Sequence, residues 1–147
     1  LHLAGSAVDV TTKGHYLGTY TVSSTGVITL GADDPRVTEI EAGFGFEPTL
    51  KQMPVDFNLE GGPVRGLKKT LSRALIDVHE ITGLSIQGRD WQPKFQGDDY
   101  ATESTGFTGI IEQHVQGIDR EAQFELVIPK GRKGTILGVT RELDLGN

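Results

Sequence analysis

The chain has 147 residues, no cysteine and a formal net charge of −6 at pH 7. This length is enough for a core of its own, in one domain or two small ones. The lack of cysteine excludes a disulfide framework and a thiolate metal site, and the negative charge argues against a basic surface that grips nucleic acid. No apolar run approaches the roughly 20 residues that span a bilayer, so we expect no membrane insertion by this segment.

The chain opens on LHLAGSAVDV without an initiator methionine, which we interpret as the start of a fragment or of a processed chain. Short apolar runs then recur between turn signals. This pattern is typical of an all-β protein, either an antiparallel β-sandwich or a small barrel, or two β subdomains. In the first part we expect strands at residues 7–10, 16–22, 27–30, 36–42 and 47–53.

Turn residues separate these strands. They are Lys13-Gly14, Ser24-Thr25-Gly26, Asp33-Asp34-Pro35 and Pro54. Proline fixes its own backbone torsion and restricts the residue before it, so it ends a strand. We therefore assign residues 1–57 to an N-terminal β subdomain. Gly43-Phe44-Gly45-Phe46 lacks the third glycine of a dinucleotide fingerprint, and we interpret it as a strand end with one or two phenylalanines in the core.

Residues 58–66 contain Gly61-Gly62-Pro63 and predict a glycine-rich hinge or loop before a C-terminal β subdomain at 67–147. Gly61 and Gly66 have the spacing of a phosphate-binding loop. That loop requires lysine directly after the second glycine, and here Leu67 stands between Gly66 and Lys68. We therefore expect no nucleotide and no cofactor.

The run from Gly66 to Gly88, GLKKTLSRALIDVHEITGLSIQG, has two readings. Leucines recur at helical spacing from Leu67 to Leu75. Alternation and β-branched residues instead favour a strand, with one face formed by Ala74, Ile76 and Val78. We favour a long strand that bends at Thr82-Gly83, where Gly83 supplies a backbone angle that other residues resist.

Residues 88–104 are polar and acidic and hold the only tryptophan. We expect a long surface loop, which is more often functional than accidental. Its candidate interaction residues are Trp91, Phe95, Asp98, Asp99 and Tyr100. The aromatic rings could stack on sugar faces, so a carbohydrate-binding β-sandwich is an alternative function. The acidic pairs Asp33-Asp34 and Asp98-Asp99 lack the alternating pattern of acidic residues that forms a calcium-binding loop.

The remaining expected strands are 107–115, 123–128 and 135–143. We expect a turn near Gly117-Ile118-Asp119, and a terminal hairpin formed by the last two strands around residues 129–134. The four histidines, His2, His15, His79 and His114, lack the spacing of a zinc site. A pair of carboxylates that come together only in the folded chain, as in a glycoside hydrolase, is an alternative that the sequence leaves open. No motif favours an enzyme. We therefore predict no catalytic residue, no metal and no cofactor.

Five short motifs follow one another along most of the chain. They are Val27-Ile28-Thr29-Leu30, Thr49-Leu50-Lys51-Gln52-Met53-Pro54, Gly66-Leu67-Lys68-Lys69-Thr70-Leu71-Ser72-Arg73, Thr82-Gly83-Leu84 and Thr135-Ile136-Leu137-Gly138-Val139. In this order they resemble the C-terminal β region of bacteriophage tail nozzle proteins, also called tail tubular or stabilisation proteins.

The resemblance implies a structural protein of the virion tail, assembled in the host cytoplasm, with no catalytic residues to carry over. Proteins of this family form a ring of identical subunits around the DNA exit channel, and they contact an adaptor ring and tail fibre or spike proteins. DNA only passes through such a ring. An acidic lumen would let the polyanion slide without sticking, in keeping with the charge of this chain.

Overall fold

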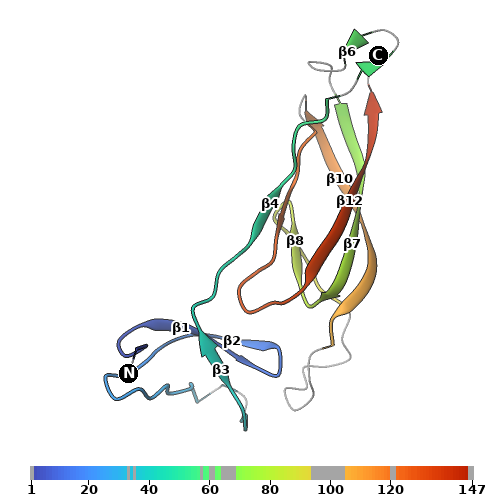
Figure 1. Ribbon diagram of the computed structural model, residues 1–147. Coiled ribbons are helices and arrows are strands. Elements are labelled where there is room, and N and C mark those ends of the chain that lie inside the picture. The colour runs from blue at the N-terminus through green and yellow to red at the C-terminus, as the bar shows by residue number, and fades with distance from the viewer. Residues whose placement is uncertain are drawn as a thin grey trace.

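The computed structural model describes residues 2–32, 34, 36–56, 58–59, 62–63, 69–93, 105–119 and 122–145 (Figure 1). These residues contain no helix, and every strand pair among them is antiparallel. The strands are β1 (Ala7–Thr12), β2 (His15–Thr21), β3 (Glu41–Gly43), β4 (Thr49–Lys51), β5 (Asn58–Leu59), β6 (Gly62–Pro63), β7 (Lys69–Ile81), β8 (Leu84–Ile86), β9 (Arg89–Trp91), β10 (Phe107–Asp119), β11 (Glu125–Val127) and β12 (Thr135–Leu145). The all-β prediction is confirmed.

Two of the sheets pack face to face as a sandwich. One has the strand order β10-β7-β12 and the other has the order β4-β11-β8-β9. Their inner faces share one apolar core, whose fully buried members include Ile76, Ile81, Leu84, Ile86 and Leu126. A continuous core between two sheets is what defines a β-sandwich.

Strand β7 is the centre of this sandwich and confirms the strand reading of the central run. Ala74, Ile76 and Val78 are all 0% exposed, whereas Asp77 and His79 between and after them face solvent. This two-residue period fits a strand and not a helix. The strand pairs with β10 on one side and β12 on the other, so both of its edges are satisfied by backbone hydrogen bonds.

The bend after β7 has a different cause from the one predicted. The residue with a left-handed backbone is Glu80 (φ 50°), at an irregularity in the β7–β10 register, and Gly83 does not have a positive φ. Gly83 leaves room for the Arg132 side chain, since a Cβ there would lie 3.2 Å from Arg132 Cγ. The Thr82 N–H donates to Lys133 O at 2.8 Å, which ties the corner to the β11–β12 connection. Beyond this corner the chain joins the other sheet.

The N-terminal strands form a separate three-stranded sheet of order β2-β1-β3, at the lower left of Figure 1. Its hairpin turns at Lys13 and Gly14, which have φ of 45° and 82°, as a two-residue turn of the primed type requires. Val8, Val10 and Val22 form its buried core.

The predicted strand at 27–30 is wrong. The Val27 N–H donates to Ser23 Oγ at 2.9 Å, and the Ser23 N–H donates to Val27 O at 2.9 Å. These bonds close a turn and leave no ladder at that point. Ile28 and Leu30 still pack against the small N-terminal core, so their apolar character has a role without a strand.

The predicted strands at 36–42 and 47–53 shrink to β3 and β4, of three residues each. β4 pairs with β11 of the sandwich, although the expected boundary at residue 57 assigns it to the N-terminal part. The division into subdomains stays a prediction. The expected hinge at 58–66 contains the short β5–β6 pair, and the rest of it, residues 60–61 and 64–66, lies outside the described residues.

Two predictions near the end of the chain are wrong. Gly117-Ile118-Asp119 continues β10 and forms no turn. The strands β11 and β12 do not form a hairpin, because β11 pairs with β4 and β8 while β12 pairs with β7. The connection at 129–134 therefore crosses from one sheet of the sandwich to the other.

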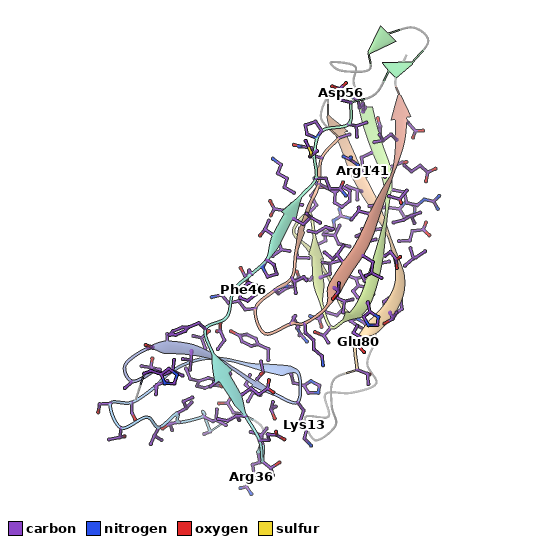
Figure 2. All side chains as sticks on the ribbon, viewed as in Figure 1. Lys13, Arg36, Phe46, Asp56, Glu80 and Arg141 are labelled. Carbon is purple, nitrogen blue, oxygen red and sulfur yellow. The ribbon has the colours of Figure 1, made fainter. Side chains whose placement is uncertain are left out.

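Arg141 closes one end of the sandwich (Figure 2). Its guanidinium donates from Nη1 to Met53 O at 2.9 Å and to Ala122 O at 3.1 Å. Burial lowers the pKa of this guanidinium from its usual value. The contact fastens the segment after β4 to the segment before β11, which keeps β4 at the sheet edge.

Candidate functional site

Of the predicted interaction residues, the structure places Trp91. Phe95, Asp98, Asp99 and Tyr100 lie outside the described residues. Trp91 ends β9, and its ring packs edge-on against Phe107 with a centroid distance of 5.4 Å and an interplanar angle of 61°. It also contacts the sandwich core. Trp91 is therefore partly a core residue and only partly available to a ligand.

Trp91 lines a cleft of about 300 Å³ where the N-terminal sheet meets the sandwich. The polar and aromatic side chains of its wall come from four separate parts of the chain. They are Tyr16 from β2, Glu47 from the β3–β4 connection, Asp90, Trp91 and Gln92 from β9 and the residue after it, and Lys130 and Arg132 from the β11–β12 connection. Two rings, two carboxylates and two cations in one hollow can bind a polar ligand with an apolar face.

The Tyr16 side of this cleft is fixed by hydrogen bonds. The Tyr16 hydroxyl donates to Asp9 Oδ1 at 3.0 Å, and the Thr19 hydroxyl donates to the same oxygen at 2.5 Å. The hydrogen bond from Thr19 lowers the pKa of Asp9 from its usual value. Burial is the next largest effect and opposes it, and Tyr16, Lys130 and the Gly45 N–H lower the pKa further. Gly131, with φ of 67°, packs directly on the Tyr16 ring.

Sequence reasoning missed Tyr16, Glu47, Asp90, Lys130 and Arg132 as site residues. The signal for the two basic residues was present in the run Lys130-Gly131-Arg132-Lys133, which we interpreted only as a turn. Nothing in the local pattern of Tyr16 or Glu47 indicates that they approach β9, because this contact is created by tertiary packing.

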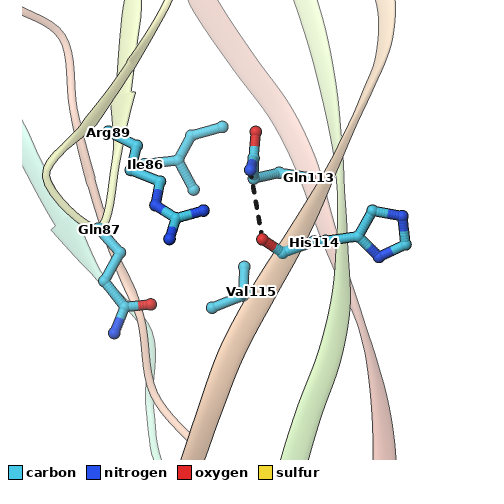
Figure 3. Close-up of a pocket in the computed structure, with 6 residues that line it drawn as sticks. All are labelled: Ile86, Gln87, Arg89, Gln113, His114 and Val115. Carbon is cyan, nitrogen blue, oxygen red and sulfur yellow. Dashed lines mark hydrogen bonds between the residues drawn. The ribbon is translucent and has the colours of Figure 1, made fainter.

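A second hollow of about 220 Å³ lies between the β8–β9 turn and β10 (Figure 3). Figure 3 shows the Arg89 guanidinium directed into it, while the His114 imidazole points away on the other side of β10. Gln113 Nε2 donates to His114 O at 3.2 Å. Among the described residues that line this hollow, Arg89 supplies the charged group directed into it.

Charged side chains on the outer face of the β10-β7-β12 sheet pair with one another. Arg73 Nε lies 2.6 Å from Glu142 Oε2, and Arg73 Nη1 lies 2.8 Å from Glu112 Oε1. The hydrogen bond to Arg73 lowers the pKa of Glu112. Within the described part of the chain, no group of three or more histidine, aspartate and glutamate side chains is placed to hold a metal ion.

Exposed apolar side chains gather on the segment from residue 44 to residue 53, which we call the apolar connector. Phe44 is 69% exposed, Phe46 79%, Leu50 45% and Met53 80%. The expectation that one or both phenylalanines lie in the core is wrong. Apolar side chains exposed in this number along one segment are typical of a surface that contacts another protein.

Across the part of the chain that the structure describes, no helix is long and apolar enough to cross a membrane. No protein-family model matches the chain, and no curated protein is significantly similar to it in sequence.

Proposed function

We propose that the chain is a structural β module of a bacteriophage tail, in a nozzle-type ring of identical subunits around the DNA exit channel. The motifs that resemble the tail nozzle family support this proposal, and so does the fold, a sandwich of antiparallel sheets. The observation that carries it is the apolar connector, because a protein that acts by assembly needs exposed apolar surface on a rigid support.

The sandwich supplies that rigid support. Its central strand is paired on both sides, and Arg141 fastens the backbone at Met53, at the end of the connector. A contact made through Phe44, Phe46 or Met53 would therefore be mechanically linked to the sandwich through β4. In the proposed tail these contacts join identical subunits, the adaptor ring and tail fibre or spike proteins.

The outer face of the β10-β7-β12 sheet suits a passage for DNA. Asp77, Glu112, Glu142 and Asp144 are exposed there, and Arg73 is paired with two of them. A surface of this sign repels the phosphate backbone, so DNA would pass without adhering. We assign this face to the channel as part of the same proposal.

The test is assembly into particles. In a phage that carries this gene, we expect the protein in purified particles at several copies, detected by mass spectrometry and by imaging of the tail. The double substitution Phe44→Ser/Phe46→Ser should remove it from particles while leaving its thermal unfolding unchanged. The matched control is Val27→Ser, which removes an exposed apolar side chain (57%) that lies outside both the connector and the face assigned to the channel. Absence of the unmodified protein from particles would refute the proposal.

The cleft supports a second candidate, carbohydrate binding. Tyr16 and Trp91 provide rings, and Glu47 and Asp90 provide acceptors for sugar hydroxyls. A glycan array followed by calorimetry tests it, with Asp90→Asn and Glu47→Gln as the cleft variants. Trp91→Ala is a weaker test, because loss of the contact with Phe107 would also destabilise the fold. If no glycan binds in a saturable way, this candidate is excluded.

A further inference from the structure

The two edges of the four-stranded sheet run in opposite directions. The order is β4-β11-β8-β9 and every neighbouring pair is antiparallel. In a sheet with an even number of such strands, the edge strand of one copy placed beside the opposite edge of a second copy continues the antiparallel pattern. The three-stranded sheet lacks this property, because β10 and β12 are both antiparallel to β7 and so run in the same direction.

The row of apolar side chains on the core-facing side of this sheet ends in an exposed residue at the β4 edge. Leu50 pairs with Leu126, which pairs with Ile86, so the three side chains lie on one face. Leu126 and Ile86 are each 1% exposed, whereas Leu50 is 45% exposed. At the other edge Trp91 pairs with Leu84 and lies on the same core-facing side. Within the described residues no further strand covers either edge.

The alternation of side chains restricts the register between the two edges. Leu50 and Trp91 both belong to the core-facing side, so only registers that match core-facing with core-facing residues keep the apolar row continuous. If Leu50 lies opposite Trp91, then Lys51 lies opposite Asp90, and both of these side chains are exposed on the outer side. A slip of one residue would place Lys51 opposite Arg89 or Trp91, which sets the lysine against a like charge or against an apolar ring.

A shift of two residues is also less favourable. It would place Lys51 opposite Gly88 or Gln92, neither of which carries a charge. A lysine on an edge strand normally prevents pairing with another sheet, unless an opposite charge meets it. Asp90 supplies that charge in one register, so the same lysine selects for this partner and against others.

We propose that β4 of one copy pairs with β9 of the next copy, with Leu50 opposite Trp91 and Lys51 opposite Asp90. This inference rests on the proposed assembly of identical subunits and names the surfaces that join them. The contact is heterologous, since it uses two different edges, and repeated contacts of this kind close into a ring when the rotation permits.

Disulfide trapping tests the pairing directly in the 147-residue chain, because this chain has no cysteine of its own. In the proposed register Thr49 lies opposite Gln92, and both are exposed. A mixture of Thr49→Cys and Gln92→Cys copies should give a covalent dimer under mild oxidation, and neither variant should do so alone. The control mixture of Thr49→Cys with Asp77→Cys should stay monomeric. Dimers of Thr49→Cys alone would indicate a two-fold contact and overturn the proposal, as would the absence of any disulfide.

Charge exchange gives an independent readout. Lys51→Asp and Asp90→Lys should each weaken association about two- to fivefold, measured by sedimentation, and the double variant should restore it. Weakening that the double variant does not reverse would contradict the Lys51–Asp90 pairing. These measurements use purified protein, so they separate from the particle test. If the disulfide forms but the protein is absent from phage particles, the strand pairing is supported and the tail function is rejected. If the protein is present in particles but no disulfide forms, the tail function is supported and the strand pairing is rejected.

Discussion

Among the described residues, the sandwich shares eleven buried apolar side chains between its two sheets, whereas the N-terminal sheet buries three. The N-terminal sheet depends more on polar contacts. Tyr16 and Thr19 bond to Asp9, Tyr20 bonds to Asp34 Oδ2 at 2.8 Å, and Thr12 bonds to Glu39 O at 2.7 Å. Buried apolar area contributes more to stability than exposed hydrogen bonds do, so the two regions should differ in how easily they open.

The largest effect is expected in the sandwich. Ile76→Ala removes a side chain that is 0% exposed at the centre of β7. Loss of the buried atoms and the cavity left behind should lower the free energy of unfolding by about 2–5 kcal/mol. Urea denaturation followed by circular dichroism measures this.

The control for Ile76→Ala is Ile110→Ala on the outer face of the same sheet, where the side chain is 63% exposed. This variant should change the unfolding free energy by about 0.5 kcal/mol or less. Equal losses in the two variants would mean that β7 is not the centre of the stable unit.

The sequence predicted this sandwich best where one strand is buried on one face and exposed on the other. The alternation of Ala74, Ile76 and Val78 with polar residues identified β7 because the local pattern and the tertiary burial agree. The prediction from sequence failed where the pairing of strands depends on residues far apart in the chain. Nothing local shows that β11 joins β4 rather than β12, since both choices satisfy the same apolar pattern.

The candidate site was less predictable than the fold. Trp91 was identified because it is the only tryptophan in a polar stretch. The exposure of Phe44 and Phe46 was not foreseen, since apolar residues between glycines predict a buried strand end as readily as a contact surface. The bend predicted at Thr82-Gly83 directly follows the end of β7, but the positive φ falls on Glu80 and not on Gly83, and no sequence rule expects it there.

The next effect concerns the N-terminal sheet. Val10→Ala removes part of a side chain that is 0% exposed in a core of three valines. We expect a loss of about 2 kcal/mol from the local stability of β1 and β2. Native-state hydrogen exchange should show faster exchange at β1 with unchanged exchange at β7. If β7 amides lose protection to the same extent, the two regions unfold as one unit and the contrast between them is lost.

A smaller effect is expected at Gly43, which ends β3, and at Gly45, which follows it. A Cβ at Gly45 would overlap the Asp9 carboxylate, whereas a Cβ at Gly43 meets no atom within 4 Å. Gly45→Ala should therefore destabilise the N-terminal sheet by about 1 kcal/mol as Asp9 moves away. Gly43→Ala should be neutral or slightly stabilising, because alanine restricts the unfolded chain. Thermal unfolding of the pair tests this, and equal melting temperatures would show that the Asp9 position is not required.

The smallest effect is a difference in acid response between the two regions. The pKa of Asp9 is lowered in the folded protein from its usual 3.8, chiefly by the Thr19 hydroxyl. A lowered pKa means that the carboxylate stabilises the N-terminal sheet above about pH 3.8, and that this contribution is lost as the pH falls through the folded-state value. In the sandwich, the pKa of Glu112 is lowered by Arg73 in the same direction. Asp9→Asn should therefore flatten the acid response of β1 amides in NMR spectra without changing those of β10, and Glu112→Gln should do the reverse. A response of both regions to either substitution would show that the two sheets are coupled through the contact of Tyr16 with Gly131.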